Sequence, residues 1–296
     1  MIADIRTQDL TVTYGETVAV DRLTLELPAG KIYGLLGRNG SGKTTLLSVL
    51  ASYRKASSGS LTVGGVDPFE NAEVMRQTTF IRDTLDVTSS DRIAGVLDFA
   101  AGLRPSFDLQ YAAKLLDTFE LDPGKRVLTL SRGQKSTLGV VLGLAARASL
   151  TLLDEVSLGM DAAARATFYR ELLADYLAHP RTVILSTHLI DEVADLFERV
   201  VIIDRGRLVL HEDADVLRGR GVTVTGPAAA VDSFVAGRTV LSEQSLGGVR
   251  AATVYGRLDD SDTDRATSTG LTLGPVGIQD LFVHLTTTPR ERETQR

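Results

Sequence analysis

The sequence contains no cysteine, no long apolar run and no cluster of basic residues. The first absence excludes disulfide bonds, thiolate metal sites and cysteine nucleophiles. The longest weakly polar run, residues 138–146, is far too short to cross a bilayer. Because the net charge is −6 and no stretch is rich in Lys or Arg, we expect no nucleic-acid partner.

The N-terminus also lacks the basic and then apolar segment of a secretory signal, so we expect a cytoplasmic protein. What is present is ordinary for a globular chain: 296 residues, of which 43% are apolar and 24% charged. That length allows either one large core or two domains.

A glycine-rich segment follows the apolar run 31–36 and precedes a helix-like apolar pattern at residues 46–50. Strand, glycine-rich loop and helix in this order are typical of a phosphate-binding loop, whose glycines let backbone N–H groups turn towards an anion. The segment consists of Gly37, Arg38, Asn39, Gly40, Ser41, Gly42, Lys43, Thr44 and Thr45. Lys43 is expected to contact the β- and γ-phosphates, and the Thr44 hydroxyl to bind Mg²⁺.

Two acids, Asp154 and Glu155, close the short apolar run 150–153. Acids at the end of a buried strand are costly to desolvate unless they meet a cation. In a phosphate-loop protein we therefore expect Asp154 to bind Mg²⁺ and Glu155 to orient a water molecule. His188 follows another buried strand, residues 182–187, and is a candidate contact for the γ-phosphate, because ligands gather at the carboxyl ends of such strands.

The rest of the first 216 residues alternates between strand-like and helix-like patterns. Residues 4–27 have the alternation of strands, and residues 91–147 have the period of several helices. Ser131 and Gly133 stand where the last of these helices begins, which suits either an anion site or a simple helix cap. A further helix after Asp161 is expected to bury Phe168, Leu172, Leu173 and Leu177.

The composition changes at residues 218–221, and residues 222–286 predict a small α/β unit followed by a polar tail. Asp260 to Asp264 is similar to the start of a calcium-binding loop. However, Arg265 stands where glycine is required, and Leu271 where a bidentate Glu is required. We therefore interpret residues 260–264 as a solvated turn.

Together these motifs resemble the ATP-binding subunit of an ABC transporter, in order and with the family's spacing, over residues 4 to about 216. The resemblance implies an α/β fold with a P-loop NTPase core, an inserted helical subdomain (about 84–145) and an antiparallel β subdomain. This ATP-binding domain would cover residues 1–216, and a small C-terminal α/β domain residues 217–296.

The resemblance also implies ATP and Mg²⁺ as cofactors and assigns a role to each motif. Tyr14 takes the adenine-stacking position, residues 37–45 form the Walker A loop, and Asp154 and Glu155 are the Walker B acid and the catalytic base. The remaining motifs are the signature, which contains Ser131, Arg132, Gly133 and Gln134, the D-loop residue Asp161, and the switch histidine His188.

Three positions depart from the family pattern. Asp83 replaces the usual Gln after the strand 80–82, Arg132 lies in the glycine pair of the signature, and Val156 replaces a Pro. A carboxylate at residue 83 is a candidate ligand of Mg²⁺, although a role in capping the following segment explains it equally well.

In such a family the chain is expected to form a head-to-tail dimer with a second ATP-binding subunit and to work on a transmembrane permease. It would then lie peripherally on the cytoplasmic face of the cell membrane. Asp83 and the C-terminal domain are similar to features of bacterial drug and antibiotic exporters. The candidates for an apolar docking patch are Leu85, Val87, Phe99, Leu103 and Phe107.

Two other function classes remain open from the sequence. A non-transport ABC ATPase acting on ribosomes or DNA would share the motifs, but such proteins carry two ATPase units, zinc motifs or long coiled coils. A metabolic phosphotransferase would share the phosphate loop but would not need the signature.

Overall fold

The computed structural model describes residues 4–83 and 90–287. The chain folds as two compact units, Met1–His211 and Glu212–Arg296. The boundary expected from the sequence, at residues 216 and 217, falls inside helix α8 (Ala214–Arg218) of the second unit. Within the described ranges, no helix has the length and the apolar content to cross a membrane.

A six-stranded sheet with the order β5-β6-β7-β3-β8-β9 forms the centre of the first unit. Strands β5, β6, β7, β3 and β8 are parallel to one another. Every residue of β3, β6 and β7 is buried, which explains why these strands are continuous apolar runs in the sequence. The strands are β3 (Ile32–Leu36), β5 (Thr78–Arg82), β6 (Leu150–Asp154), β7 (Thr182–Ser186), β8 (Arg199–Asp204) and β9 (Arg207–Asp213).

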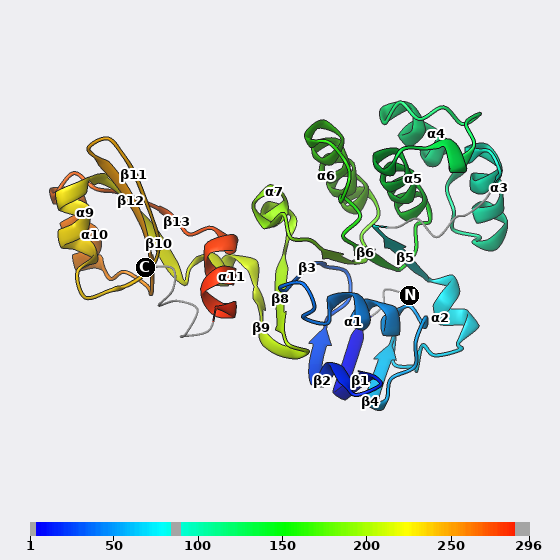
Figure 1. Cartoon of the computed structure of the whole chain (residues 1–296), viewed down its shortest axis with the longest axis horizontal. Helices are drawn as coiled ribbons and strands as arrows, with labels where there is room; N and C mark the ends of the chain where they lie inside the picture. The colour runs from blue at the N-terminus through cyan, green and yellow to red at the C-terminus, as the bar shows by residue number, and fades with distance from the viewer. Residues whose placement is uncertain (1–3, 84–89, 288–296) are drawn as a thin grey trace. The chain divides into compact units, whose positions relative to one another are not determined.

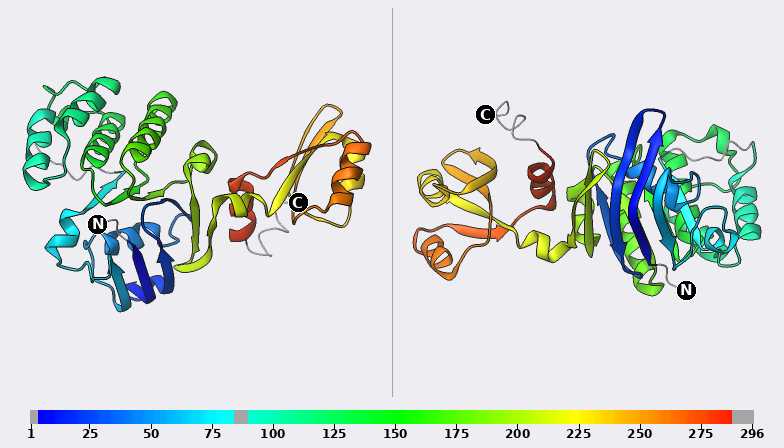
Figure 2. Two further views of the ribbon diagram at one scale, coloured as in Figure 1. Left: turned by 180° about the vertical axis from the view of Figure 1, so that it is seen from behind. Right: turned by 90° about the horizontal axis from the view of Figure 1, so that it is seen from below.

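A second sheet, with the order β2-β1-β4, is antiparallel (Figures 1 and 2). It consists of β1 (Ile5–Tyr14), β2 (Thr17–Leu27) and β4 (Ser58–Val63). The predicted alternation is confirmed, since Leu23, Leu25 and Leu27 are buried. Helix α1 (Lys43–Leu50) shares one hydrophobic core with both sheets, so the end of the glycine-rich loop is firmly held.

Three helices form the predicted helical block and gather beyond the β5 edge of the parallel sheet (Figure 1). They are α3 (Ile93–Leu103), α4 (Leu109–Thr118) and α5 (Arg132–Ala145), with a short 3-10 turn, η1 (Val127–Thr129), before α5. Helix α5 is buried on nearly every side because it packs against α3, α4, α6 and β5. A short helix, α2 (Ala72–Arg76), precedes β5.

Helix α6 (Ala162–Ala178) differs from the sequence prediction. Phe168 and Leu172 are buried, but Leu173 is 38% exposed and Leu177 is 70% exposed. The buried stripe continues instead to Asp175, one turn beyond Leu172. Two short segments, α7 (Ile190–Val193) and η2 (Ala194–Leu196), follow β7.

The second unit is an α/β unit, as predicted. Its four-stranded sheet has the order β11-β12-β10-β13. The hydrophobic core of this unit includes Val231, Phe234 and Val254. The elements are α8, β10 (Gly221–Pro227), α9 (Ala228–Val235), β11 (Thr239–Leu246), β12 (Val249–Tyr255), α10 (Asp260–Ser268), β13 (Thr272–Pro275) and α11 (Ile278–Thr286).

The interpretation of residues 260–264 as a turn was wrong. They form the first turns of α10, and the Asp259 carboxylate caps the helix by accepting a hydrogen bond from the Asp262 N–H (2.8 Å). Acidic residues in a first helical turn are stabilised by the helix dipole, so their polarity favours this helix as well as a turn.

A buried ionic cluster joins α5, α6 and β7 in the first unit. The Asp175 side chain is only 1% exposed and accepts hydrogen bonds from Arg147 (2.5 Å) and Arg181 (2.6 Å). The Arg181 side chain is itself only 4% exposed and also donates to the Thr151 hydroxyl. Since each buried charge relies on the others, removing one partner is expected to be costly.

We therefore predict that Asp175→Asn lowers the free energy of unfolding of the first unit by about 3–5 kcal/mol, because Arg181 is left buried without a counter-ion. Denaturant unfolding, compared between variant and wild type, measures this loss. The control is Glu26→Gln, which breaks an ion pair with Arg6 whose side chains are both 64% exposed, and should cost less than about 1 kcal/mol. Equal effects of the two substitutions would contradict the prediction.

Candidate functional site

The glycine-rich loop connects β3 to α1 and lines a cavity of about 330 Å³ together with Glu155. Gly37 is required for close packing, because a Cβ there would lie 2.3 Å from the Ser41 hydroxyl and 2.5 Å from the Ile203 carbonyl. Gly40 and Gly42 have φ values of 78° and 105°, which side-chain-bearing residues rarely adopt. The loop thus has the backbone shape that its glycines predicted.

Lys43 and Ser41 give this cavity the character of an anion site. The Lys43 ammonium donates to the loop's own carbonyls, at 2.7 Å to Gly37 and 3.4 Å to Arg38. Burial lowers the pKa of Lys43, while the charges of Glu155 and Asp154 act in the opposite direction. The buried Ser41 hydroxyl has no hydrogen-bond partner among the described residues. A desolvated cation beside an unpaired hydroxyl fits the phosphate groups of a nucleotide.

The two acids occupy the carboxyl end of β6, as the sequence predicted. Asp154 is buried and accepts a hydrogen bond from the Ser186 hydroxyl at 2.5 Å. The Glu155 carboxylate lies 2.7 Å from Nδ1 of His188, which also follows a strand end. Glu155 itself has a φ of 52°, an uncommon conformation for a residue with a side chain.

The register of the sheet explains why these side chains meet. In the parallel ladder, Asp154 is paired with Arg82 of β5 on one side and with Ser186 of β7 on the other. Ser186 was not identified from the sequence, where it is only a polar residue at the end of an apolar run. Its signal in the sequence was its position at the end of a predicted buried strand, whereas its place beside Asp154 comes from the order of the strands in the sheet.

The same residues suit Mg²⁺. Thr44 is the second residue of α1, after Lys43, and Asp154 supplies a carboxylate that Ser186 holds in place. The described residues include no group of three or more acidic, histidine or cysteine side chains suited to a metal ion. Mg²⁺ usually takes only one or two protein ligands beside substrate phosphates, so this arrangement agrees with a metal that binds together with a nucleotide.

The predicted signature forms the start of α5. The Ser131 hydroxyl accepts from the Gln134 N–H (3.2 Å), and the Gln134 side chain accepts from the Ser131 N–H (3.1 Å), which is a capping box. Gly133 packs tightly, since a Cβ there would lie 2.7 Å from the Gly159 carbonyl. The Arg132 guanidinium lies 3.7 Å from the Asp83 carboxylate, a pairing that the sequence did not suggest.

Asp161 and Tyr14 lie at exposed ends of elements. The Asp161 carboxylate caps α6 by accepting from the Ala164 N–H at 2.8 Å. Tyr14 is 45% exposed at the end of β1, and the Arg54 guanidinium lies 3.8 Å from the centre of its ring. Arg54 also donates to the Thr13 carbonyl, so it fixes the aromatic ring from one side.

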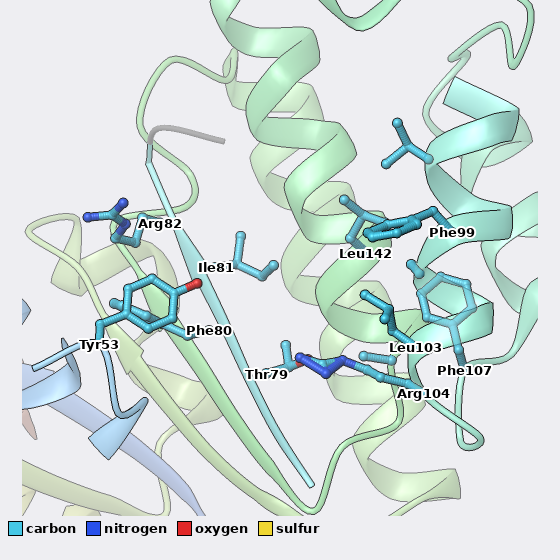
Figure 3. A pocket seen from close by; sticks show the side chains of 13 residues that line it. Tyr53, Thr79, Phe80, Ile81, Arg82, Phe99, Leu103, Arg104, Phe107 and Leu142 are labelled. Carbon is cyan, nitrogen blue, oxygen red and sulfur yellow. The ribbon is translucent and has the colours of Figure 1, made fainter. Parts of the chain in front are cut away.

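A second hollow, which we call the helical groove, lies between β5 and the helical block (Figure 3). It has a volume of about 320 Å³, and Phe99 and Leu103 in it are 68% and 59% exposed. Two of the predicted docking residues, Leu85 and Val87, lie outside the described residues. The lining residues are Tyr53, Thr79, Phe80, Ile81, Arg82, Val96, Phe99, Ala100, Leu103, Arg104, Phe107, Leu142 and Ala146.

The sequence identified Phe99, Leu103 and Phe107 as candidates for an apolar patch, and the structure brings all three to the helical groove. It did not identify Tyr53, Arg82 and Arg104, because they come from separate segments that meet only in the folded chain. Figure 3 shows Tyr53 and Arg82 on the opposite side of the β5 ribbon from Phe99 and Phe107.

Comparison with known proteins agrees with these observations. Residues 20–157 match the family model described as ABC transporter. The bacitracin transport ATP-binding protein BcrA of Bacillus licheniformis is 31% identical over 233 residues, which cover 73% of this chain and 72% of BcrA. The daunorubicin/doxorubicin resistance ATP-binding protein DrrA of Streptomyces peucetius is 31% identical over 214 residues, which cover 69% of this chain and 64% of DrrA.

Solved structures show the same fold at lower sequence identity. An ATP-binding subunit of an ABC transporter has a TM-score of 0.66 at 21% identity, with 74% of this chain and 92% of that chain covered. A dimeric ATP-binding cassette in a post-hydrolysis state, bound to ADP and Pi, has a TM-score of 0.63 at 18% identity and covers 71% of this chain and 98% of its own.

The fold expected from the resemblance, a P-loop core with a helical block, an antiparallel sheet and a C-terminal α/β unit, is therefore confirmed. On the strength of the sequence relatives, this chain belongs to the ABC transporter family of ATP-binding proteins and is an ATPase.

Proposed function

We propose that this chain binds ATP with Mg²⁺ at the glycine-rich loop and hydrolyses it to power a separate membrane permease. The observation that carries the proposal is that Lys43 and Glu155 line one cavity, while Nδ1 of His188 lies 2.7 Å from the Glu155 carboxylate. A cation for the phosphates and an acid for the attacking water are the parts that phosphoryl transfer to water requires.

Each residue then has a distinct task. Lys43 leaves its loop carbonyls to contact the β- and γ-phosphates, and the backbone of residues 39–45 surrounds them. Thr44 and Asp154 hold Mg²⁺, which when bound neutralises charge on the phosphate oxygens. Glu155 accepts a hydrogen bond from the water that attacks the γ-phosphate, while His188 keeps the Glu155 carboxylate in place.

A second copy would complete the site. The described residues that line the loop cavity are 19, 39–45 and 155, so the signature of the same chain does not line it. Ser131 and Arg132 at the N-terminus of α5 are exposed, so another subunit can reach them. In a head-to-tail dimer, the signature of one subunit would cover the ATP bound to the glycine-rich loop of the other. Asp161 would lie at the interface between the subunits, and the adenine ring would stack on Tyr14.

The helical groove is the proposed docking site for the permease, on the cytoplasmic face of the membrane. Its exposed Phe99 and Leu103 form an apolar surface that an isolated subunit would leave in contact with water. The related proteins DrrA and BcrA are named for drug resistance and bacitracin transport. We therefore propose export of a drug-like, peptide or lipid substrate rather than action on ribosomes or DNA.

We predict that Lys43→Ala weakens ATP binding at least tenfold and abolishes hydrolysis, because no other cation lines the described part of the loop cavity. Titration with a fluorescent ATP analogue and a phosphate-release assay measure the two effects. The control Lys114→Ala removes an ammonium that is 67% exposed on α4, and should leave both unchanged. Wild-type ATP affinity in Lys43→Ala would contradict the assigned role.

Glu155→Gln should keep ATP binding but reduce the hydrolysis rate by about 100-fold or more, because the amide cannot accept the proton of the attacking water. With MgATP present, the trapped complex should elute as a dimer in size-exclusion chromatography. Glu73→Gln, at a glutamate that is 72% exposed on α2, serves as the control and should turn over normally. If Glu155→Gln hydrolyses ATP at the wild-type rate, Glu155 is not the base.

The docking proposal is tested by co-expression with a candidate membrane permease. We predict that the double change Phe99→Glu and Leu103→Glu releases the protein from the membrane fraction while ATP binding persists, since charges oppose burial in an apolar contact. Leu177→Glu is the matched control, because Leu177 is 70% exposed on α6, outside the helical groove. Equal release by both variants, or co-sedimentation with ribosomes, would speak against docking at the groove.

A further inference from the structure

Two departures from the family pattern, Asp83 and Arg132, contact each other in the folded chain. The Arg132 guanidinium lies 3.7 Å from the Asp83 carboxylate, although they come from different elements. Asp83 directly follows β5, and Arg132 is the first residue of α5. Their side chains are 33% and 65% exposed, so the ion pair is reachable by solvent.

The position of Asp83 gives this ion pair its importance. Arg82 and Asp154 are the last pair of the parallel ladder between β5 and β6, so Asp83 and Glu155 directly follow the ends of two neighbouring strands. Adjacent strands are about 4.8 Å apart. Asp83, Asp154 and Glu155 therefore lie at the same carboxyl edge of the sheet. Arg132 brings a positive charge to Asp83, the acid that follows the edge strand β5.

The loop between β6 and α6 guides the Arg132 side chain. A Cβ at Gly159 would lie 3.1 Å from Cγ and 3.3 Å from Cδ of Arg132, so the aliphatic part of the side chain packs directly over this glycine. Gly159 has a φ of 94°, which favours glycine there for backbone reasons as well. The route from α5 to Asp83 is thus set by packing as well as by charge.

We propose that Arg132 is a positioning residue for ATP hydrolysis that acts through Asp83. It holds the Asp83 carboxylate away from the Asp154 and Glu155 carboxylates and fastens the start of α5 to the carboxyl edge of the sheet. This inference rests on the proposed function, since it concerns the geometry around the catalytic base. It also makes Asp83 and Arg132 a matched pair rather than two independent variations.

The size of the effect follows from the exposure of the ion pair. An ion pair that is this exposed to solvent changes an equilibrium constant by at most about fivefold, and dissolved salt weakens its attraction. Arg132 should therefore tune the rate of hydrolysis, unlike Glu155, on which the reaction depends. Its effect should be present only while residue 83 carries a charge.

The test is a double-mutant cycle on the purified chain with Arg132→Gly, Asp83→Gln and the two combined. Arg132→Gly alone should lower kcat about three- to fivefold, with the KM for ATP within about twofold and the melting temperature unchanged. In the Asp83→Gln background the same change should alter kcat less than about 1.5-fold. Arg132→Lys, which keeps the charge, should recover most of the rate.

Two measurements distinguish this role of Arg132 from the general effect of removing one positive charge from the protein. Raising the salt to about 0.5 M should reduce the difference between wild type and Arg132→Gly, because the pair is screened. The control Lys125→Gln removes an exposed positive charge from the helical block and should leave kcat unchanged at either salt concentration.

An equal loss of kcat with and without Asp83 would overturn the inference, since Arg132 would then act on another group. A raised KM in both backgrounds, or no loss at all in Arg132→Gly, would overturn it as well. These outcomes differ from failure of the proposed function, which would appear as wild-type hydrolysis by Glu155→Gln.

Discussion

The nucleotide site is built around one ammonium group, that of Lys43, which is buried and forms no ion pair with the residues that the structure describes. A desolvated cation is costly, and burial lowers the pKa of Lys43 accordingly. The loop carbonyls of Gly37 and Arg38 and the nearby charges of Asp154 and Glu155 offset part of that cost. A bound phosphate would offset more of it, so the burial of Lys43 favours nucleotide binding.

The parallel register of the sheet brings the partners of that ammonium group together. Strands β5, β6 and β7 end at the same level, which places Asp83, Asp154 and Ser186 along one edge. The hydroxyl of Ser186 and the imidazole of His188 then hold the two acids at the carboxyl end of β6. A shift of one residue in this register would reverse the direction of every side chain and separate the site.

Helix α5 connects this edge to the helical groove. Its N-terminus carries the capping box and Arg132, whereas Leu142, three turns further along, lines the groove. The helix is buried on nearly every side, because it packs closely against the elements around it. Strand β5 makes the same connection, since Arg82 lines the groove and Asp83 reaches Arg132. Helix α5 and strand β5 are therefore the connection that we propose between the nucleotide site and the docking surface.

The phosphate loop, the two acids at the end of β6 and the buried strands could be predicted from the sequence, because each is encoded within a few consecutive residues. It failed for α6, where the buried stripe includes the charged Asp175 and leaves Leu173 and Leu177 to solvent. An apolar count cannot detect a buried charge whose partners, Arg147 and Arg181, come from other segments. The helical groove, the Ser186 contact and the Arg132–Asp83 pair likewise join residues far apart in the chain. These three features could not be predicted from the sequence, because their residues come together only when the strands of the sheet pair in the correct register.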